Sequence, residues 1–348
     1  METRILKIDG PEYDPDVLLP AAKALAEGKL VAFPTETVYG LGANALDPQA
    51  VCRIFEAKGR PSDNPLIVHI SRIEEINPLI VSIPAKARIL ADAFWPGPLT
   101  LVFNKSALVP DEITAGLSTV AVRMPDNRIA LKLIELAGVP VAAPSANISG
   151  RPSPTDAAHV IQDLSGRVDI IIDGGSCTVG LESTVIDMTV DPPVVLRPGG
   201  ITVEMLEKKI GKVVVDNILE KDGNIAPKSP GMKYRHYSPR AEMTIVAGDA
   251  DKVVDRINEY TKKYMSKNLK TGVLASKETF ARYAATVVLC PGSKERPENI
   301  AAGIYSCLRK FDDEGVDVIF AEAFSEQGIG LAIMNRLKKA AAGRIIYV

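Results

Sequence analysis

Apolar and polar positions along the chain alternate between a helical spacing and a strand-like spacing from Pro15 onward. Residues 17–27 carry apolar side chains at helical spacing and end at Gly28, and an apolar strand-like run over 30–33 follows directly. Further runs rich in Val and Ile predict strands over 66–70, 99–103, 119–123, 139–143, 169–173, 184–188 and 194–197. Helical spacing predicts helices over 48–57, 85–94, 127–137, 155–164 and 202–210. Because several strands follow one another without a helix between them, we expect an α/β domain with a twisted, mixed sheet.

A change of composition separates this region from the rest of the chain. Residues 223–241 are rich in proline and basic side chains and contain no acidic residue, which indicates a linker. Beyond it, predicted strands over 243–247, 272–275, 286–289 and 316–321 alternate with predicted helices over 250–266, 277–284, 298–313 and 329–341. This alternation is typical of a small parallel α/β domain. We therefore expect a first domain over 14–210, a linker over 211–241 and a second domain over 242–348.

Length and charge agree with two ordinary globular domains. The chain has 348 residues, and its 41 basic against 43 acidic side chains leave a net charge of −2. With such a balance the protein has no overall positive electrostatic potential that would attract the phosphate backbone of nucleic acid. We therefore expect at most weak direct binding of tRNA. No apolar run reaches the roughly 18 residues of a membrane span. We expect a cytoplasmic protein without a zinc site, because the cysteines form no CxxC pair: Cys52, Cys177, Cys290 and Cys307.

Three polar segments stand at the ends of predicted elements in the first domain. Residues 34–42 follow the strand over 30–33, and residues 142–150 follow the strand near 139–143. Residues 58–65 end a helix and place Lys58 and Arg60 around a glycine. Ligands of open α/β sheets bind at the carboxyl ends of strands, which favours a binding site. A solvated turn or a simple helix end fits each segment equally well when it is taken alone.

Taken together, the polar segments predict a particular kind of chemistry. Thr119 and Arg123 share one strand, Ser183 precedes another, and Arg197 ends a third. The chain has no G-x-x-x-x-G-K-[ST], HExxH or G-x-S-x-G motif, which leaves little support for a P-loop nucleotide site, a metallopeptidase or a serine hydrolase. We expect a concave site of cations, hydroxyls and amides without a carboxylate pair or a nucleophile–base couple. Such a site suits ATP together with a small zwitterion.

These segments closely resemble the YrdC family of threonylcarbamoyl-AMP synthases. The resemblance covers about residues 14–210 in order and spacing. It rests on PTETVYGLGANA (34–45), EAKGRPSDNPL (56–66), WPGPLTLV (95–102), TVAVRMP (119–125), PVAAPSANISGRPSPT (140–155), STVIDM (183–188) and LRPGG (196–200). SPGMKYRHYSP (229–239) and GLAIMNRLKKAA (330–342) are similar to the longer, two-domain class of the same family, which implies a YrdC-like first domain and a smaller second one.

The resemblance implies a reaction and the residues that serve it. Members of the family condense L-threonine, bicarbonate or CO₂, and ATP into L-threonylcarbamoyl-adenylate and pyrophosphate, with Mg²⁺ bound to the ATP and no dedicated metal site on the protein. The product passes to a threonylcarbamoyl transferase complex for the N6-threonylcarbamoyl modification of adenosine 37 in tRNA, and the linker folds over the site as a lid. The implied catalytic residues are Lys58, Arg60, Ser145 and Asn147; the threonine site Thr37, His69, Arg123, Ala143 and Ser183; and the ATP site Arg60, Asn64, Thr119, Ser145, Ser153, Arg197 and His236.

Two other functions fit parts of the sequence. A related adenylating domain occurs in enzymes that make carbamoyl-adenylate from carbamoyl phosphate for hydrogenase maturation, but those carry paired CxxC zinc motifs and further large domains. A non-catalytic module for tRNA or double-stranded RNA is the second alternative, against which the net charge of −2 argues. The sequence does not identify the base that deprotonates the threonine amine.

Overall fold

The structure is a computed structural model that describes residues 1–8, 10, 12–216 and 237–348. The described residues form two compact units. The first holds residues up to 216, apart from two short segments, and the second holds residues 237–348 together with those segments, Gly150–Pro152 and Val179–Leu181. Most of the predicted linker over 211–241 lies outside the described residues.

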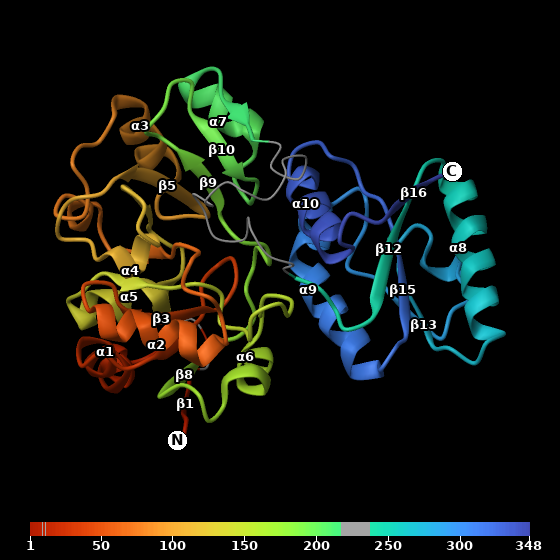
Figure 1. Ribbon diagram of the computed structural model, residues 1–348, viewed down its shortest axis with the longest axis horizontal. Helices are drawn as coiled ribbons and strands as arrows, with labels where there is room; N and C mark the ends of the chain where they lie inside the picture. The colour runs from red at the N-terminus through yellow and green to blue at the C-terminus, as the bar shows by residue number, and fades with distance from the viewer. Residues whose placement is uncertain (9, 11, 217–236) are drawn as a thin grey trace. The chain divides into compact units, whose positions relative to one another are not determined.

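The first unit is an α/β structure around one large sheet (Figure 1). Its strands are β1 Arg4–Lys7, β2 Val31–Phe33, β3 Gly40–Asn44, β4 Ile67–His69, β5 Leu99–Asn104, β6 Thr119–Arg123, β7 Val141–Ala142, β8 Ile170–Asp173, β9 Thr184–Asp187, β10 Val194–Arg197 and β11 Val214–Val215. Its α-helices are α1 Leu19–Ala26, α2 Pro48–Lys58, α3 Ala85–Phe94, α4 Asp111–Thr114, α5 Arg128–Ala137, α6 Ala157–Leu164 and α7 Val203–Ile210. Two 3₁₀ turns, η1 Pro15–Leu18 and η2 Ile73–Ile76, accompany them.

The sheet is mixed, as the sequence predicts. Its 11 strands lie in the order β1-β8-β2-β3-β7-β4-β6-β5-β9-β10-β11. Parallel pairs such as β4 with β6 alternate with antiparallel pairs such as β5 with β6. The short strand β3 was not predicted, because its sequence GLGAN is poor in the β-branched residues that mark a strand. It nevertheless pairs with β2 on one side and β7 on the other.

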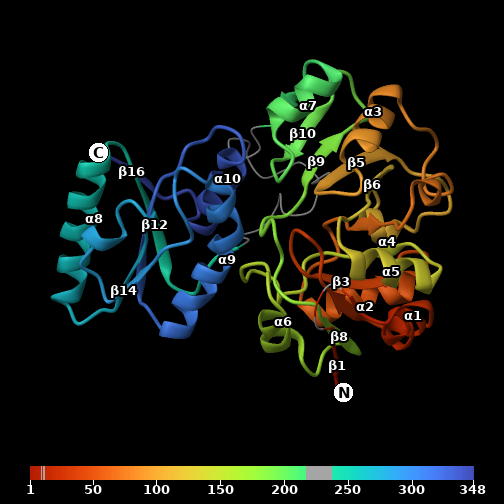
Figure 2. The same cartoon turned by 180° about the vertical axis from the view of Figure 1, so that it is seen from behind.

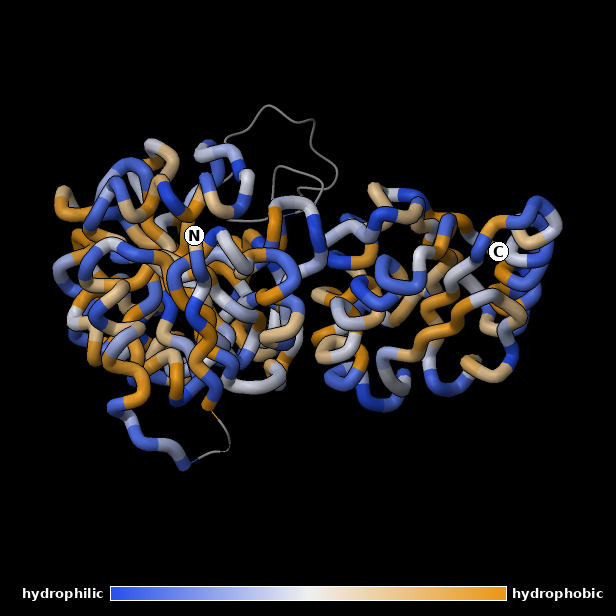
Figure 3. The backbone as a smooth tube through the Cα atoms, turned by 90° about the horizontal axis from the view of Figure 1, so that it is seen from below, coloured by the Kyte–Doolittle hydropathy of each residue, from blue (hydrophilic) through white to orange (hydrophobic). Residues whose placement is uncertain are grey.

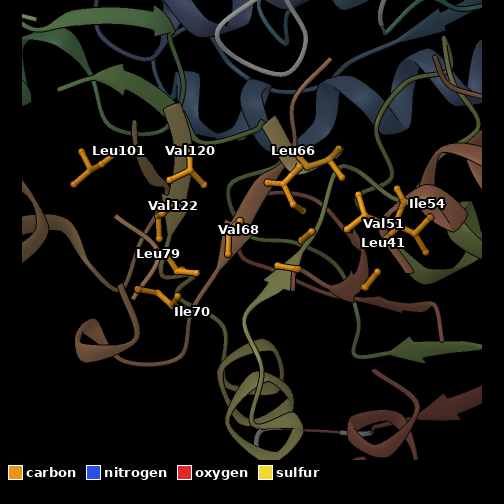
Figure 4. Close-up of a cluster of buried hydrophobic side chains, with 14 of the residues drawn as sticks. Leu41, Val51, Ile54, Leu66, Val68, Ile70, Leu79, Leu101, Val120 and Val122 are labelled. Atoms are coloured by element: carbon orange, nitrogen blue, oxygen red, sulfur yellow. The ribbon is translucent and has the colours of Figure 1, made fainter. Parts of the chain in front are cut away.

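The two faces of this sheet have different roles. One face packs against α2, α3 and α6 in the main hydrophobic core, which Figure 4 shows around Leu41, Ile54, Val68 and Val122. The opposite face carries two smaller apolar clusters: α1 and α5 cover the end near β2 and β8, and Ile67, Val102, Ala121, Val185 and Leu196 form the other cluster. Side chains alternate between the faces along each strand, so polar residues on the second face are held by a rigid core behind them.

Helix α2 carries one of the polar segments at its end. Its first turn is capped by Asp47, whose side chain accepts hydrogen bonds from the backbone N–H groups of Gln49 and Ala50. The helix ends at Gly59, whose φ of 59° lies in the left-handed region that glycine adopts without strain. The local sequence thus fixes the last turn of α2, and with it the position of Lys58.

Helix α5 offers a stability variant away from the polar segments. The Asn127 side chain accepts hydrogen bonds from the backbone N–H groups of Ile129 and Ala130, at 3.0 and 3.1 Å. We expect Asn127→Ala to lower the free energy of unfolding by about 1 kcal/mol, since a helix cap is lost. Urea denaturation measures this change. An unfolding midpoint equal to that of the parent chain would show that the cap does not contribute.

The second unit is a parallel α/β structure, as the sequence predicts. Its 5 strands lie in the order β14-β13-β15-β12-β16, and all its pairs are parallel. Helix α8 packs on β12 and β13, and Figure 2 shows it across the sheet from α9 and α10. The strands are β12 Glu242–Ala247, β13 Thr271–Leu274, β14 Val287–Leu289, β15 Val318–Glu322 and β16 Ile345–Tyr347; the helices are α8 Ala250–Met265, α9 Pro297–Glu314 and α10 Gly330–Ala340.

One predicted element of this unit is wrong. A helix was expected over 277–284, where the structure has only the 3₁₀ turn η4, Phe280–Arg282. The hydroxyls of Ser276 and Thr279 and the phenol of Tyr283 donate instead to the buried carboxylate of Glu322. These tertiary hydrogen bonds hold the segment in an irregular path. Figure 3 shows hydrophobic stretches passing through the inside of each unit and hydrophilic turns at its outside.

Candidate functional site

The structure brings the three polar segments of the first domain together. Backbone hydrogen bonds join the first segment to the third, from Leu41 N to Pro144 O at 2.8 Å and from Ala146 N to Tyr39 O at 2.8 Å. The second segment joins the third through Ser149 N and Lys58 O, at 2.9 Å. The prediction that these segments form one site rather than separate surface turns is therefore consistent with the geometry.

Lys58 is the centre of this junction. Its side chain is 2% exposed, and its Nζ donates to Ser145 O at 2.5 Å and to Asn147 O at 2.6 Å. A third contact, to Asn147 Oδ1, is longer at 3.4 Å. The Ser145 hydroxyl donates to the same Oδ1 at 2.6 Å. Two carbonyl acceptors thus hold a buried ammonium group in one position, which is the arrangement that electrostatic catalysis requires.

Arg60 and Asn64 lie in the loop after α2. Arg60 Nη2 donates to the carbonyl of Asn64 at 3.1 Å, and its guanidinium lies 5.8 Å from the centre of the Phe55 ring. Asn64 is fully buried, yet neither polar atom of its side-chain amide has a hydrogen-bond partner among the described residues. A buried amide without partners is costly unless a ligand completes it.

A row of polar side chains crosses the sheet on the face opposite the main core. His69 of β4 lies in register with Arg123 of β6, and Arg123 lies in register with Thr100 of β5. Residues in register on neighbouring strands project from the same face, so these three side chains are neighbours. All three are buried. The carboxyl ends of β4 and β6, which are parallel, thus meet at this row, where ligands of α/β sheets bind.

Arg123 forms an ion pair within this row. Its Nη2 lies 2.7 Å from Oε1 of Glu36, and both side chains are almost completely buried. Burial, together with the charge of Arg123, lowers the pKa of His69 to about 3. His69 is therefore neutral at physiological pH. It makes a contact of 3.2 Å between Nδ1 and the Ile67 carbonyl.

Ser183 and Arg197 form a second hydrogen-bonded group beside β9. Arg197 Nε donates to Ser183 O at 3.0 Å, and its Nη2 donates to the Ser183 hydroxyl at 3.1 Å. That hydroxyl also shares a hydrogen bond of 2.7 Å with Thr100. A Cβ at Gly199 would lie 2.3 Å from Thr184 N, so only glycine allows the turn after Arg197 to approach β9. Ser183 is thereby linked to the polar row.

Thr119 lies at the other end of β6 from Arg123. The two residues project from one face, and the three residues between them correspond to a separation of about 13 Å along the strand. Between them lie Ala121 and the two residues in register with it on the neighbouring strands, Ile67 and Val102, which form an apolar floor. The face thus presents a strip with a polar group at each end and an apolar middle.

The structure also places the remaining predicted residues. Thr37 is fully buried and shares a hydrogen bond of 2.8 Å with Thr35, and Ala143 follows β7, with its N–H donating to Ile67 O at 2.9 Å. Ser153 donates to Glu182 Oε1 at 2.6 Å, and both side chains are buried. His236 lies outside the described residues.

Sequence reasoning missed three residues of this region: Glu36, Thr100 and Glu182. The expectation of a site without paired carboxylates did not take account of Glu36 and Glu182, both of which are buried beside predicted site residues. Glu36 stands inside the first polar segment and Glu182 directly before Ser183, so their positions in the sequence were a usable signal. Thr100 is visible only through the strand register.

The described part of the chain holds neither a metal-binding cluster nor a membrane-spanning helix. No group of three or more His, Cys, Asp or Glu side chains there is arranged to hold a metal ion. No helix there is both long and apolar enough to cross a bilayer.

The mixed sheet and the segments around it bring together buried cations, hydroxyls and an unpartnered amide, an arrangement typical of enzymes that bind and transfer anionic groups. A family model described as telomere recombination matches residues 23–199, and a second, described as the C-terminal domain of threonylcarbamoyl-AMP synthase, matches residues 201–342. The chain belongs to the threonylcarbamoyl-AMP synthase family, in the form that joins a YrdC-like domain to a Sua5 C-terminal domain.

Similar proteins cover nearly the whole chain. A threonylcarbamoyl-AMP synthase of Pyrococcus abyssi is 55% identical over 328 residues, which are 94% of this chain and 95% of the relative. That of Bacillus subtilis is 52% identical, over 96% of this chain and 95% of the relative. A crystal structure of P. abyssi Sua5 complexed with L-threonine superimposes with a TM-score of 0.94 and 53% identity, over 99% of this chain and 100% of that one.

These comparisons confirm the predictions of family, fold class and enzymatic activity. The enzyme is a threonylcarbamoyl-AMP synthase that acts in the synthesis of N6-threonylcarbamoyladenosine, so the RNA-binding module without catalysis is wrong as the principal function. Two relatives at 55% and 52% identity that are named threonylcarbamoyl-AMP synthase likewise argue against the carbamoyl-adenylate reaction.

Proposed function

We propose that the strip on β6 divides the site, with L-threonine at its Arg123 end and ATP towards Thr119. The observation that carries this assignment is the buried guanidinium of Arg123, because a planar fork of donors matches a carboxylate. The L-threonine bound in the P. abyssi structure supports an amino-acid pocket in a chain of this fold. The residues assigned to this pocket are Thr37, His69, Arg123, Ala143 and Ser183.

The ATP assignment rests on the polar groups around the apolar floor. The unpartnered amide of Asn64 supports it, since a nucleotide would supply both a donor and an acceptor. The apolar floor of Ile67, Ala121 and Val102 suits the flat face of a purine. The residues assigned to ATP are Arg60, Asn64, Thr119, Ser145, Ser153, Arg197 and His236.

Lys58, Arg60, Ser145 and Asn147 are assigned to the transfer itself. A carbamate oxygen of N-carboxylated threonine attacks the α-phosphorus of ATP, and pyrophosphate leaves. Both reactants are anions, so the protein must hold them in line and offset charge on the phosphate oxygens. The long contact from Lys58 to Asn147 Oδ1 supports this role, because a phosphate oxygen can replace so weak a partner at little cost.

Mg²⁺ is proposed to reach the site with the triphosphate. The cationic groups of Lys58 and Arg60 suit phosphate oxygens rather than a metal, and no group of three or more His, Cys, Asp or Glu side chains among the described residues is arranged to hold one. When bound, the ion would offset part of the phosphate charge. The proposed partner for the product is a threonylcarbamoyl transferase complex. We propose at most weak direct contact with tRNA.

Omitting the substrates in turn tests the proposed reaction. We expect purified enzyme with Mg²⁺ and ATP to release pyrophosphate only when L-threonine and bicarbonate are both present, because the attacking anion is assembled from them. A coupled pyrophosphate assay and chromatography of the nucleotide product measure this. Release without bicarbonate would indicate direct adenylation of the amino acid. Release that requires carbamoyl phosphate would favour the carbamoyl-adenylate reaction.

Several predictions stay untested by the geometry. The lid role of residues 229–237 falls mainly on positions outside the described residues. We propose the domain limits at 210 and 242 and the cytoplasmic location from the sequence.

A further inference from the structure

The reaction needs a base that the assigned residues do not supply. The amino group of threonine is mostly an ammonium ion at neutral pH, and its nitrogen can bond to carbon only after losing a proton. Lys58 and Arg60 are already protonated, and Ser145 and Asn147 are not bases near neutral pH. His69 is neutral, but burial and Arg123 lower its pKa to about 3, which makes it a weak base. Another group must take the proton.

Glu36 is buried in the threonine end of the site and is incompletely bonded. Its side chain is 6% exposed, and Oε1 lies 2.7 Å from Arg123 Nη2. Neither carboxylate oxygen, nor Arg123 Nη2, has a hydrogen bond of good geometry among the described residues. Buried carboxylates normally accept several hydrogen bonds, so this pair is balanced in charge but not in hydrogen bonds. The missing donors are those that a ligand would bring.

The charges of this pair match those of a zwitterion. L-threonine adds one carboxylate and one ammonium group, so a carboxylate on Arg123 and an ammonium on Glu36 leave every buried charge beside an opposite one. If Glu36 were absent, the ammonium group would enter this buried space beside a guanidinium, which repels it. If Glu36 stayed on Arg123 alone, the ammonium would be buried without a partner.

We infer that Glu36 binds the ammonium group of L-threonine and then accepts its proton. The inference rests on the proposed placement of the substrate carboxylate on Arg123. Loss of the proton turns the ammonium into a neutral amine, and the same proton neutralises Glu36, so no unpaired charge remains. Glu36 then passes the proton to the hydroxyl of bicarbonate, which leaves as water and yields CO₂. The amine lone pair bonds to the carbon of CO₂, and the second nitrogen proton goes to solvent, which gives the carbamate.

A ligand without the amino group tests the binding part of this inference. (R)-3-Hydroxybutanoate keeps the carboxylate, hydroxyl and methyl groups of L-threonine and lacks only the amine. Calorimetry on the full chain should show that Glu36→Gln weakens L-threonine about tenfold or more, because a hydrogen bond to a charged partner is lost. The affinity for (R)-3-hydroxybutanoate should stay the same or rise. Glu36→Asp, which keeps the charge, should retain most of the preference for L-threonine.

The pH profile tests the proton transfer. Three titratable groups lie around this position: Arg123 pairs with Glu36, His69 lies in register with Arg123, and the Cys177 thiol senses the charge of Glu36. Burial raises the pKa of that thiol. With His69 neutral and Arg123 always charged, none of them changes charge between about pH 6 and pH 9. The ratio of kcat/KM for L-threonine in Glu36→Gln to that in the parent enzyme should therefore rise about tenfold per pH unit up to the amine pKa, because the variant can use only free amine from solution.

The outcomes separate this inference from the function on which it rests. Equal weakening of both ligands by Glu36→Gln, or a flat pH ratio, would show that Glu36 only orients Arg123. If Arg123→Gln weakens neither ligand, the carboxylate assignment itself is wrong. Far-UV circular dichroism and thermal unfolding establish that each variant is folded, and Glu36→Ala, which also removes the charge, provides the test if Glu36→Gln does not fold.

Discussion

Lys58→Met should lower kcat/KM for threonylcarbamoyl-adenylate synthesis by about 100-fold or more, which corresponds to roughly 3 kcal/mol of transition-state stabilisation. The physical reason is the fixed position of the ammonium group. Ser145 O and Asn147 O hold Nζ in place before the substrates bind, so none of its electrostatic effect is lost to reorganisation. Methionine fills a similar volume without the charge. Steady-state pyrophosphate release measures the change.

A second cation on the same helix provides the matched control. Arg53 of α2 donates to Gly28 O at 2.9 Å and pairs with Asp169 at 3.1 Å. Like Lys58, it therefore bonds to a backbone carbonyl and holds the helix in place. We expect Arg53→Met to lower stability without changing kcat/KM by more than about threefold. If Lys58→Met is folded and behaves like Arg53→Met in the assay, Lys58 only supports the end of α2.

Much of the fold follows from the periodicity of the sequence. The apolar run before Gly28, the helix that ends at Gly59 and the strand that contains Arg123 are all visible as local patterns. Where a strand lacks β-branched residues, as in β3, pairing with neighbours on both sides decides the structure instead. The helix expected over 277–284 does not form for a similar reason. The carboxylate of Glu322, which lies on strand β15, accepts hydrogen bonds from hydroxyl groups in and beside this segment.

Local motifs identify some residues of the site, and others come together only through the pairing of distant strands. The motifs identify Lys58, Arg60 and Asn147 because each lies in a distinctive segment. The row of His69, Arg123 and Thr100 depends on the register of three strands, which no local pattern specifies. The Glu36–Arg123 pair joins a turn to a distant strand, so a solvated turn was an equally good interpretation of Glu36 until the structure placed it.

Arg123→Gln should raise KM for L-threonine by about 100-fold and leave KM for ATP nearly unchanged, because the carboxylate contact that we propose for this buried guanidinium would be lost at one end of the strip only. The substitution also leaves Glu36 as a buried charge without its partner, which costs about 3–5 kcal/mol of stability. A simple loss of activity would therefore have two explanations, namely a missing substrate contact or a partly unfolded enzyme.

The double variant Arg123→Gln with Glu36→Gln separates these explanations. Two neutral amides of similar size can hydrogen-bond to each other, so the free energy of unfolding should return to within about 1 kcal/mol of the parent value. The KM for L-threonine should not recover, because both charges that match the zwitterion are gone. Urea denaturation and steady-state kinetics measure the two effects. Recovery of threonine affinity along with stability would mean that Arg123 contributes to the fold and that the substrate carboxylate binds elsewhere.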